Sequence, residues 1–166
     1  MKIGICTDVS DISRVEKMGF DYLESSVSRT ASMGEQEFME AVQRVEDSSL
    51  ECEAFNVLFP GNIRLTGPEV DLKAVREYLG KAFDRIHRLG AEIAVFGSGR
   101  SRKVPEGWKQ EDAWKQLVDA ARIVGDVAAK YGLTVAMEPL NRGETNILNS
   151  VEEGYHFVRD VNHPNI

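Results

Sequence analysis

The sequence has few cysteines and no long hydrophobic run. Its 166 residues include only two cysteines, Cys6 and Cys52, too few for the disulfide framework of small secreted domains. Both lie in apolar stretches, so we expect reduced residues of the core. No apolar run approaches the ~20 residues of a membrane-spanning helix, and the N-terminus lacks the hydrophobic segment of a signal peptide. We therefore expect a cytoplasmic protein that does not enter a membrane.

Basic side chains and histidines are also scarce. The chain has 20 Lys and Arg against 27 Asp and Glu, which gives a net charge of −7, and only three histidines. A protein that binds a phosphate backbone needs a basic surface, so we expect no nucleic-acid partner. An acidic chain remains compatible with a divalent metal, because carboxylates are hard ligands. No HExxH or CxxC motif offers an alternative metal site.

The chain is long enough for one domain with a real core, which we place at residues 1–166. Short β-favouring runs alternate with amphipathic segments of helical period, and this alternation predicts an α/β fold with a parallel sheet. The strands are predicted at residues 2–7, 22–25, 50–59, 92–96 and 133–137, and the helices at 12–18, 35–45, 71–89, 111–131 and 151–161.

The connections between these segments differ in length. Links from helix to strand have about one to three residues, whereas most links from strand to helix have about eight to fourteen, where ~2–6 is usual. Long loops at the C-terminal ends of the strands are typical of (β/α) barrel enzymes. We predict an incomplete TIM barrel, the first five βα units of eight, with parallel strands in the order 1-2-3-4-5. A doubly wound sheet is the rival, but no phosphate-binding glycine motif follows the first strand.

The densest group of polar side chains follows the fifth predicted strand. Glu138 stands directly after the apolar run 133–137, Pro139 ends the strand, and Asn141, Arg142 and Glu144 crowd the next turn. An acid at the C-terminal end of a buried parallel strand is typical of an active site. The simpler alternative is a glutamate that only solvates the strand end. With Asn141, Arg142 and Glu144 so close, we interpret Glu138 as a functional residue.

A second polar loop follows the fourth predicted strand. It contains a glycine pair and the basic residues Arg100, Arg102 and Lys103. These cations fit either a solvated loop or a site for a sugar phosphate or an acid. We include Arg102, together with Glu144, Asn141 and Arg142, among the candidate substrate-binding residues.

Several of these segments resemble the xylose isomerase-like TIM barrel superfamily, and within it the group of sugar isomerases and epimerases that includes ketose 3-epimerases and hydroxypyruvate isomerase-like proteins. The resemblance runs through essentially the whole chain. Its most specific part is the motif after the fifth strand. It is carried by residues 137–142 (MEPLNR), Glu144, 146–150 (NILNS), 95–99 (VFGSG) and 102–107 (RKVPEG).

This resemblance implies roles for the residues after the fifth strand. Glu138 resembles both the first of four metal ligands and one of two glutamates that move a proton through an enediolate. Glu144 resembles the contact to a substrate hydroxyl, while Asn141 and Arg142 would hold the loop by hydrogen bonds and an ion pair. The implied cofactor is a divalent metal (Mn, Mg, Co or Zn), and the implied ligand is a sugar or sugar phosphate.

The sequence departs from the family in its length. It ends at Ile166, where a sixth strand should begin, whereas a full barrel has about 250 residues. The family's other three metal ligands, an Asp, a His and a Glu, follow strands six to eight. We therefore expect no measurable epimerase activity from this chain alone, and we assign the divalent metal to the complete barrel. Five strands cannot close a barrel of normal size, so we expect a homo-oligomer that covers the open edge.

Two other functions remain open at this stage. An endonuclease IV-like phosphodiesterase shares the barrel, although the acidic balance and the few histidines argue against it. A non-catalytic half-barrel that binds a partner is the third hypothesis. Metal titration would separate the first hypothesis from the third, and nicking of abasic DNA would support the second.

Overall fold

The computed structural model describes residues 1–166 and contains one sheet of five parallel strands. The order along the sheet is β1-β2-β3-β4-β5, which confirms the predicted topology. Each neighbouring pair is parallel, with Cys6 opposite Glu24 in the first pair and Phe96 opposite Met137 in the last. The strands are β1 (Gly4–Cys6), β2 (Tyr22–Ser26), β3 (Glu51–Asn56), β4 (Ile93–Phe96) and β5 (Thr134–Met137).

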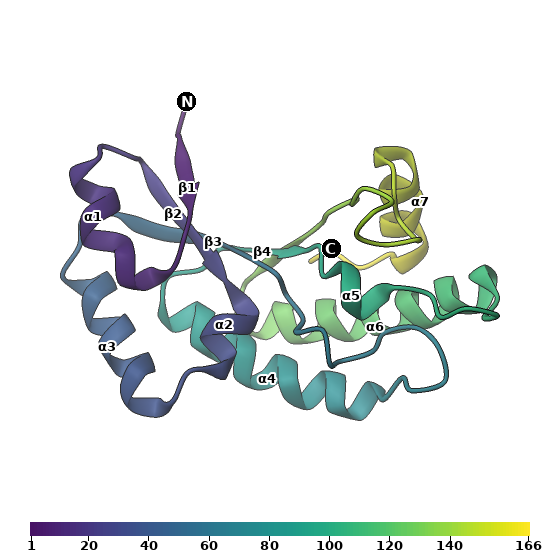
Figure 1. Ribbon diagram of the computed structural model, residues 1–166. Helices are drawn as coiled ribbons and strands as arrows, with labels where there is room; N and C mark the ends of the chain where they lie inside the picture. Colours follow the sequence, from purple (N-terminus) through teal and green to yellow (C-terminus); the bar gives the residue numbers. More distant parts are fainter.

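The helices are α1 (Ile12–Lys17), α2 (Val27–Ser32), α3 (Glu35–Glu46), α4 (Leu72–Arg88), α5 (Gly99–Arg102), α6 (Gln110–Lys130) and α7 (Val151–Val161), with a short 3-10 turn, η1 (Val9–Asp11), before α1. Helices α2, α3, α4 and α6 lie below the sheet in Figure 1, whereas α1 lies beside its β1 end and α7 beside its other end. No helix is both long enough and apolar enough to cross a bilayer.

Two short helices occupy segments that we predicted as loops. Helix α2 follows β2 directly because the Ser26 hydroxyl accepts a hydrogen bond from the backbone N–H of Arg29 and so caps the helix. Helix α5 occupies the predicted basic loop after β4. The third strand is also shorter than residues 50–59, because Val57 takes a left-handed conformation with a φ of 48° and ends the pairing.

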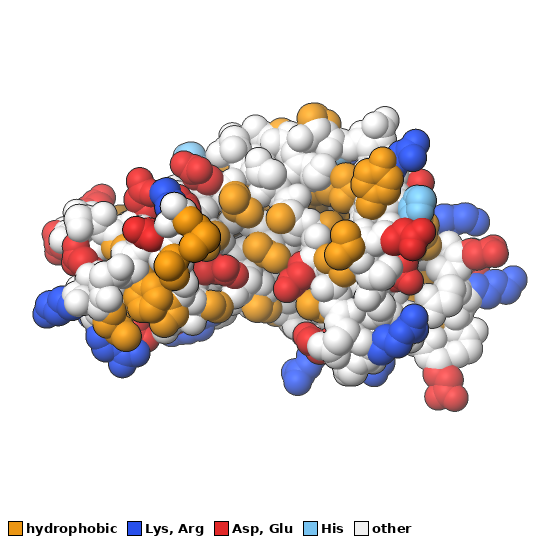
Figure 2. Space-filling model, turned by 90° about the horizontal axis from the view of Figure 1, so that it is seen from above, with side chains coloured by type: hydrophobic (Ala, Val, Ile, Leu, Met, Phe, Trp, Pro, Cys, Tyr) orange, Lys and Arg blue, Asp and Glu red, His pale blue; other side chains and the backbone are white.

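Alternation along the strands separates a covered face from an open face of the sheet. Leu23, Ala94 and Val135 are buried beneath the helices, where they belong to the single large hydrophobic core. Their neighbours Glu24 and Val95 point to the other face, which no helix covers (Figure 1). Figure 2 views this open face and shows hydrophobic and acidic side chains intermingled across its middle.

The two edges of the sheet differ. β1 pairs only with β2, whereas the last residues of the chain return to the free side of β5. There the backbone N–H of Val135 donates to the carbonyl of Asn165 at 2.7 Å, and the Asn165 side-chain amide donates to the carbonyl of Leu133 at 2.9 Å. The segment after α7 therefore lies where a next parallel strand would start.

A buried arginine fixes helix α2 to α4. The guanidinium of Arg85 donates to the carbonyls of Thr30 at 3.2 Å and Met33 at 2.6 Å and pairs with Glu35 at 3.0 Å. It also lies 4.7 Å from the centre of the Phe38 ring. Arg85 thus donates to carbonyls at the C-terminal end of α2, where the carbonyl of Thr30 also accepts from the backbone N–H of Met33.

Candidate functional site

A cavity of about 380 Å³ opens where the C-terminal ends of β2, β3, β4 and β5 meet. The cavity lies on the open face of the sheet, and each of these four strands or the loop after it contributes to its wall. Three of its side chains are carboxylates and none is basic. The lining residues are Glu24, Asn56, Val57, Val95, Ser98, Gly99, Glu138, Leu140 and Glu144.

Glu138 enters this cavity from the end of β5. Its backbone N–H donates to the carbonyl of Phe96 at 3.2 Å, which extends the pairing of β4 and β5 by one residue before Pro139. The carboxylate then lies over Gly97, because a methyl group on Gly97 would overlap the Glu138 Oε2 atom. A glycine at position 97 therefore gives the carboxylate its room.

Glu144 lies in the same cavity at the end of a short turn. The backbone N–H of Gly143 donates to Asn141 Oδ1 at 2.9 Å, and that of Glu144 donates to the carbonyl of Asn141 at 3.0 Å. The Asn141 amide also donates to the carboxylate of Glu144. Asn141 is absent from the cavity wall, so the structure gives it the loop-holding part of its predicted role.

Arg142 does not form the ion pair that the resemblance implied. Its side chain is exposed and takes part in none of the structure's ion pairs, in which the nearest arginine in sequence is Arg122, paired with Asp119. Nor does Arg142 line the cavity. That expectation was wrong because the turn from Asn141 to Glu144 closes through hydrogen bonds of Asn141 alone.

Arg102, which we named as a candidate substrate-binding residue, lies wholly inside the protein with 0% exposure. Its guanidinium donates to the carbonyls of Phe96 at 3.3 Å, Glu138 at 2.8 Å and Leu148 at 3.4 Å. The left-handed conformation of Ser98, with a φ of 45°, starts α5 and turns Arg102 inward. The side chain therefore lies behind the cavity rather than in its wall.

The charges around the cavity act on Glu138 in opposite directions. Partial burial against the Gly97 turn raises the pKa of Glu138, the positive charge of Arg102 lowers it, and the carboxylates of Glu144 and Glu24 raise it again, with a net upward shift. Burial lowers the pKa of Arg102 to about 10, a shift that Glu138 and Glu144 oppose. A carboxylate with a raised pKa is suited to take up and return a proton.

Several residues of this cavity were not among the predicted site residues. Glu24 lies in the middle of β2, whereas Glu138 follows the last residue of β5, so both acids come from the strands or their ends. Asn56, Val57 and Ser98 gave no signal in the sequence. Val57 and Ser98 are both non-glycine residues in the left-handed region, a conformation that costs energy and is concentrated at functional sites.

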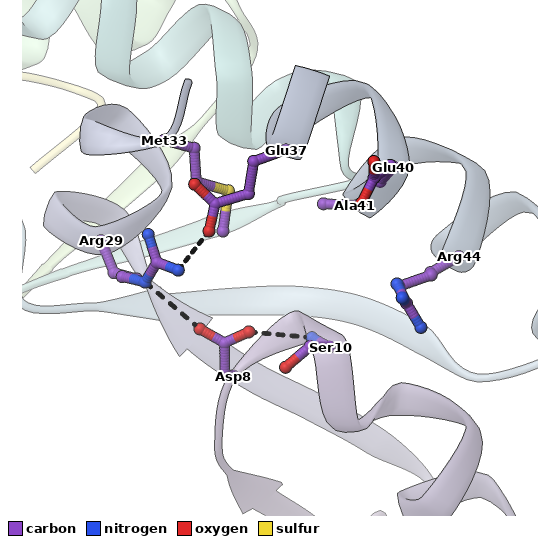
Figure 3. Close-up of a pocket in the computed structure, with 8 residues that line it drawn as sticks. All are labelled: Asp8, Ser10, Arg29, Met33, Glu37, Glu40, Ala41 and Arg44. Atoms are coloured by element: carbon purple, nitrogen blue, oxygen red, sulfur yellow. Dashed lines mark hydrogen bonds and ion pairs between the residues drawn. The ribbon is translucent and has the colours of Figure 1, made fainter. Parts of the chain in front are cut away.

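A second cavity, of about 260 Å³, lies between η1, α2 and α3 (Figure 3). Arg29 stands between two acids there, with its Nε 3.6 Å from Asp8 and its Nη2 paired with Glu37. Asp8 also accepts a hydrogen bond from the N–H of Ser10 at 2.9 Å. Because the charge of Arg29 is already matched, this group ties the loop after β1 to the helices rather than offering an anion site.

The residues present do not build a metal site. No group of three or more His, Cys, Asp or Glu side chains in the structure could hold a metal ion. Glu138 is the one residue that the resemblance assigns to a metal, and the other acids of the cavity, Glu24 and Glu144, do not form such a group with it. A catalytic metal site normally takes three or more protein ligands, so we derive no chemical step through a metal.

Comparison with known sequences gives consistent relatives. The family described as xylose isomerase-like TIM barrel matches residues 12–166. A D-psicose 3-epimerase of Ruminiclostridium cellulolyticum is 24% identical over 160 residues, which cover 93% of this chain and 54% of that protein. An L-ribulose 3-epimerase of Methylomonas sp. is 32% identical over 105 residues, or 63% of this chain and 36% of that one. The chain thus spans about half the length, or less, of these curated relatives.

Solved structures agree on the fold. The crystal structure of D-psicose 3-epimerase with D-tagatose from Clostridium cellulolyticum H10 has a TM-score of 0.83 at 23% identity and covers 99% of this chain and 61% of that one. A 3-keto-D-glucoside 4-epimerase from E. coli has a TM-score of 0.80 at 16% identity, with 99% and 66% covered. At these identities the likeness concerns the fold alone.

Proposed function

Because the chain belongs to the xylose isomerase-like TIM barrel family, we propose that its cavity is part of the site of a ketose epimerase. The observation that carries this proposal is the position of the Glu138 carboxylate, at the C-terminal end of β5 and inside the cavity. In a (β/α) barrel the chemistry takes place at this end of the strands. Curated relatives that match most of this chain are 3-epimerases of ketoses.

In this proposal Glu138 moves a proton on the carbon next to the sugar carbonyl. Its raised pKa brings proton uptake and release closer to neutral pH than for a free carboxylate. Glu144 accepts hydrogen bonds from sugar hydroxyls, and its position is fixed by Asn141. The divalent cation of a complete barrel and the cytoplasmic location stay predictions.

The charge of the cavity favours a neutral sugar over a sugar phosphate. Glu24, Glu138 and Glu144 surround the space, and no lysine or arginine lines it. Arg102 cannot bind a phosphate there, because its guanidinium already donates to backbone carbonyls behind the cavity. A phosphate would therefore meet three negative charges without a partner. A phosphodiester is also negatively charged, so the three carboxylates of the cavity disfavour an endonuclease-like function as well.

Nuclear magnetic resonance of the uniformly ¹⁵N-labelled chain tests the proposal without requiring turnover. Titration with D-tagatose should shift the amide signals of Gly97, Gly99 and Gly143, which adjoin the cavity residues. D-Glucitol, which has no carbonyl, and D-fructose 6-phosphate serve as controls and should shift them less. Glu138→Gln should weaken the response to D-tagatose. Shifts confined to other parts of the chain, or a stronger response to the phosphate, would refute the assignment.

A further inference from the structure

Arg102 shares its hydrogen-bond acceptors with the backbone that carries the two candidate carboxylates. The carbonyl of Phe96 accepts from Arg102 and also from the N–H of Glu138. The carbonyl of Leu148 accepts from Arg102 and also from the N–H of Leu140. Between these two, the carbonyl of Glu138 itself accepts from Arg102 at 2.8 Å. One guanidinium thus joins the end of β4, the end of β5 and the far side of the loop after β5.

We propose that Arg102 is a positioning residue, which holds Glu138 and the loop through Glu144 in the geometry of the sugar site. It acts through the backbone and does not touch the sugar. This inference rests on the proposed function only in treating the cavity as a sugar site.

Arginine suits this place because its planar group donates in several directions at once. The carbonyls of Phe96, Glu138 and Leu148 lie on three separate segments, and the fork of Arg102 reaches all of them. Its Nε atom is buried without a partner. The three hydrogen bonds of the other guanidinium nitrogens offset the free-energy cost of burying that N–H group. A lysine at this position would keep the positive charge, but its single ammonium group could not reach all three carbonyls.

The surrounding loops fix Arg102 in turn. The Thr66 hydroxyl lies 3.2 Å from the carbonyl of Arg102 and 2.9 Å from that of Lys103 and donates between them. The N–H of Leu65 donates to the carbonyl of Ser101 at 2.8 Å. The Asn146 amide donates to the carbonyl of Val104 at 3.0 Å. The loops after β3, β4 and β5 are therefore connected around this one side chain, and the loops carry most of the cavity wall.

Hydrogen exchange of the full chain tests the proposal, with Arg85 as a matched control. Arg85 is also a buried arginine that donates to backbone carbonyls, but at the end of α2. Arg102→Met should speed exchange of the Glu138 and Leu140 amides by about tenfold relative to amides inside α4. Arg85→Met should leave the exchange rates of the Glu138 and Leu140 amides, relative to those inside α4, unchanged. It should instead speed exchange of the Met33 amide, at the end of α2.

Arg102→Lys gives a second measurement, which decides if the methionine variant does not fold. We expect at least a threefold faster exchange of the Glu138 amide relative to α4, since lysine cannot reproduce the fork. The positioning role would be overturned if the variant that folds kept the original exchange rate of the Glu138 amide relative to α4. It would also be overturned if exchange became faster by the same factor at all amides. These exchange rates are measured without sugar, so their outcome is independent of the D-tagatose titration. If both tests succeed, Arg102→Lys should also weaken the D-tagatose response.

Discussion

Replacing Gly97 with alanine puts a methyl group where the Glu138 carboxylate lies. The new Cβ atom would overlap Oε2 and would stand 3.3 Å from Cδ of Glu138. The backbone of Gly97 accepts alanine without strain, because its φ is not positive. The carboxylate is the far end of a flexible side chain, so it should swing away by roughly 1 Å while the fold stays intact.

The magnitude of this effect follows from hydrogen-bond geometry. A contact of ordinary length that is stretched by roughly 1 Å is no longer a hydrogen bond. Losing one such bond to a charged group costs about 2 kcal/mol, or about 30-fold in the dissociation constant. The free energy of unfolding should change by less than about 1 kcal/mol, because alanine also restricts the unfolded chain.

Two assays separate these effects. Amide shifts on titration with D-tagatose give the affinity, and urea unfolding gives the stability. Gly80→Ala is the control, since Gly80 lies inside α4 with nothing within 4 Å of an added Cβ. It should stabilise the helix by about 1 kcal/mol and leave the affinity unchanged. An affinity of Gly97→Ala within about threefold of the original, or a loss of stability above about 2 kcal/mol, would refute the reasoning.

Four further predictions concern stability, reactivity, assembly and turnover. Arg85→Met should lower the free energy of unfolding in urea by about 3 kcal/mol, because carbonyls at the end of α2 lose their partner; a loss below about 1 kcal/mol would contradict this account. Cys52 is buried, but Cys6 is exposed and so does not lie in the core as we had expected. Burial raises the pKa of the Cys52 thiol to about 12, so iodoacetamide at neutral pH should label Cys6 and spare Cys52, as peptide mass mapping would reveal. Light scattering at micromolar concentration should detect an oligomer that covers the open face of the sheet, and a uniform monomer would oppose it. The chain alone should not epimerise D-tagatose above the background of added metal, and a turnover that Glu138→Ala abolishes would disprove this expectation.

The sequence by itself determined the order of the elements and the position of the main carboxylate. Helical spacing of apolar residues and the glycines that end helices are local signals, so they predicted α4, α6 and β5 well. The position of Glu138 followed from the same logic, because an apolar run that is closed by a proline places the acid between them at the strand end. The α/β class and the parallel order were confirmed, while the metal-binding role stays a prediction.

The tertiary structure alone decided which side chains meet at the cavity and which lie behind it. Glu24 and Glu138 are 114 positions apart in the sequence, as their numbers give, and only the closing of the sheet brings them to one space. The sequence allowed Arg102 a place either in a solvated loop or in a ligand site, yet the structure buries it behind the cavity, where its guanidinium donates to three backbone carbonyls. The burial of a side chain and its hydrogen-bond partners depend on residues distant in the sequence, so a local sequence pattern does not predict them.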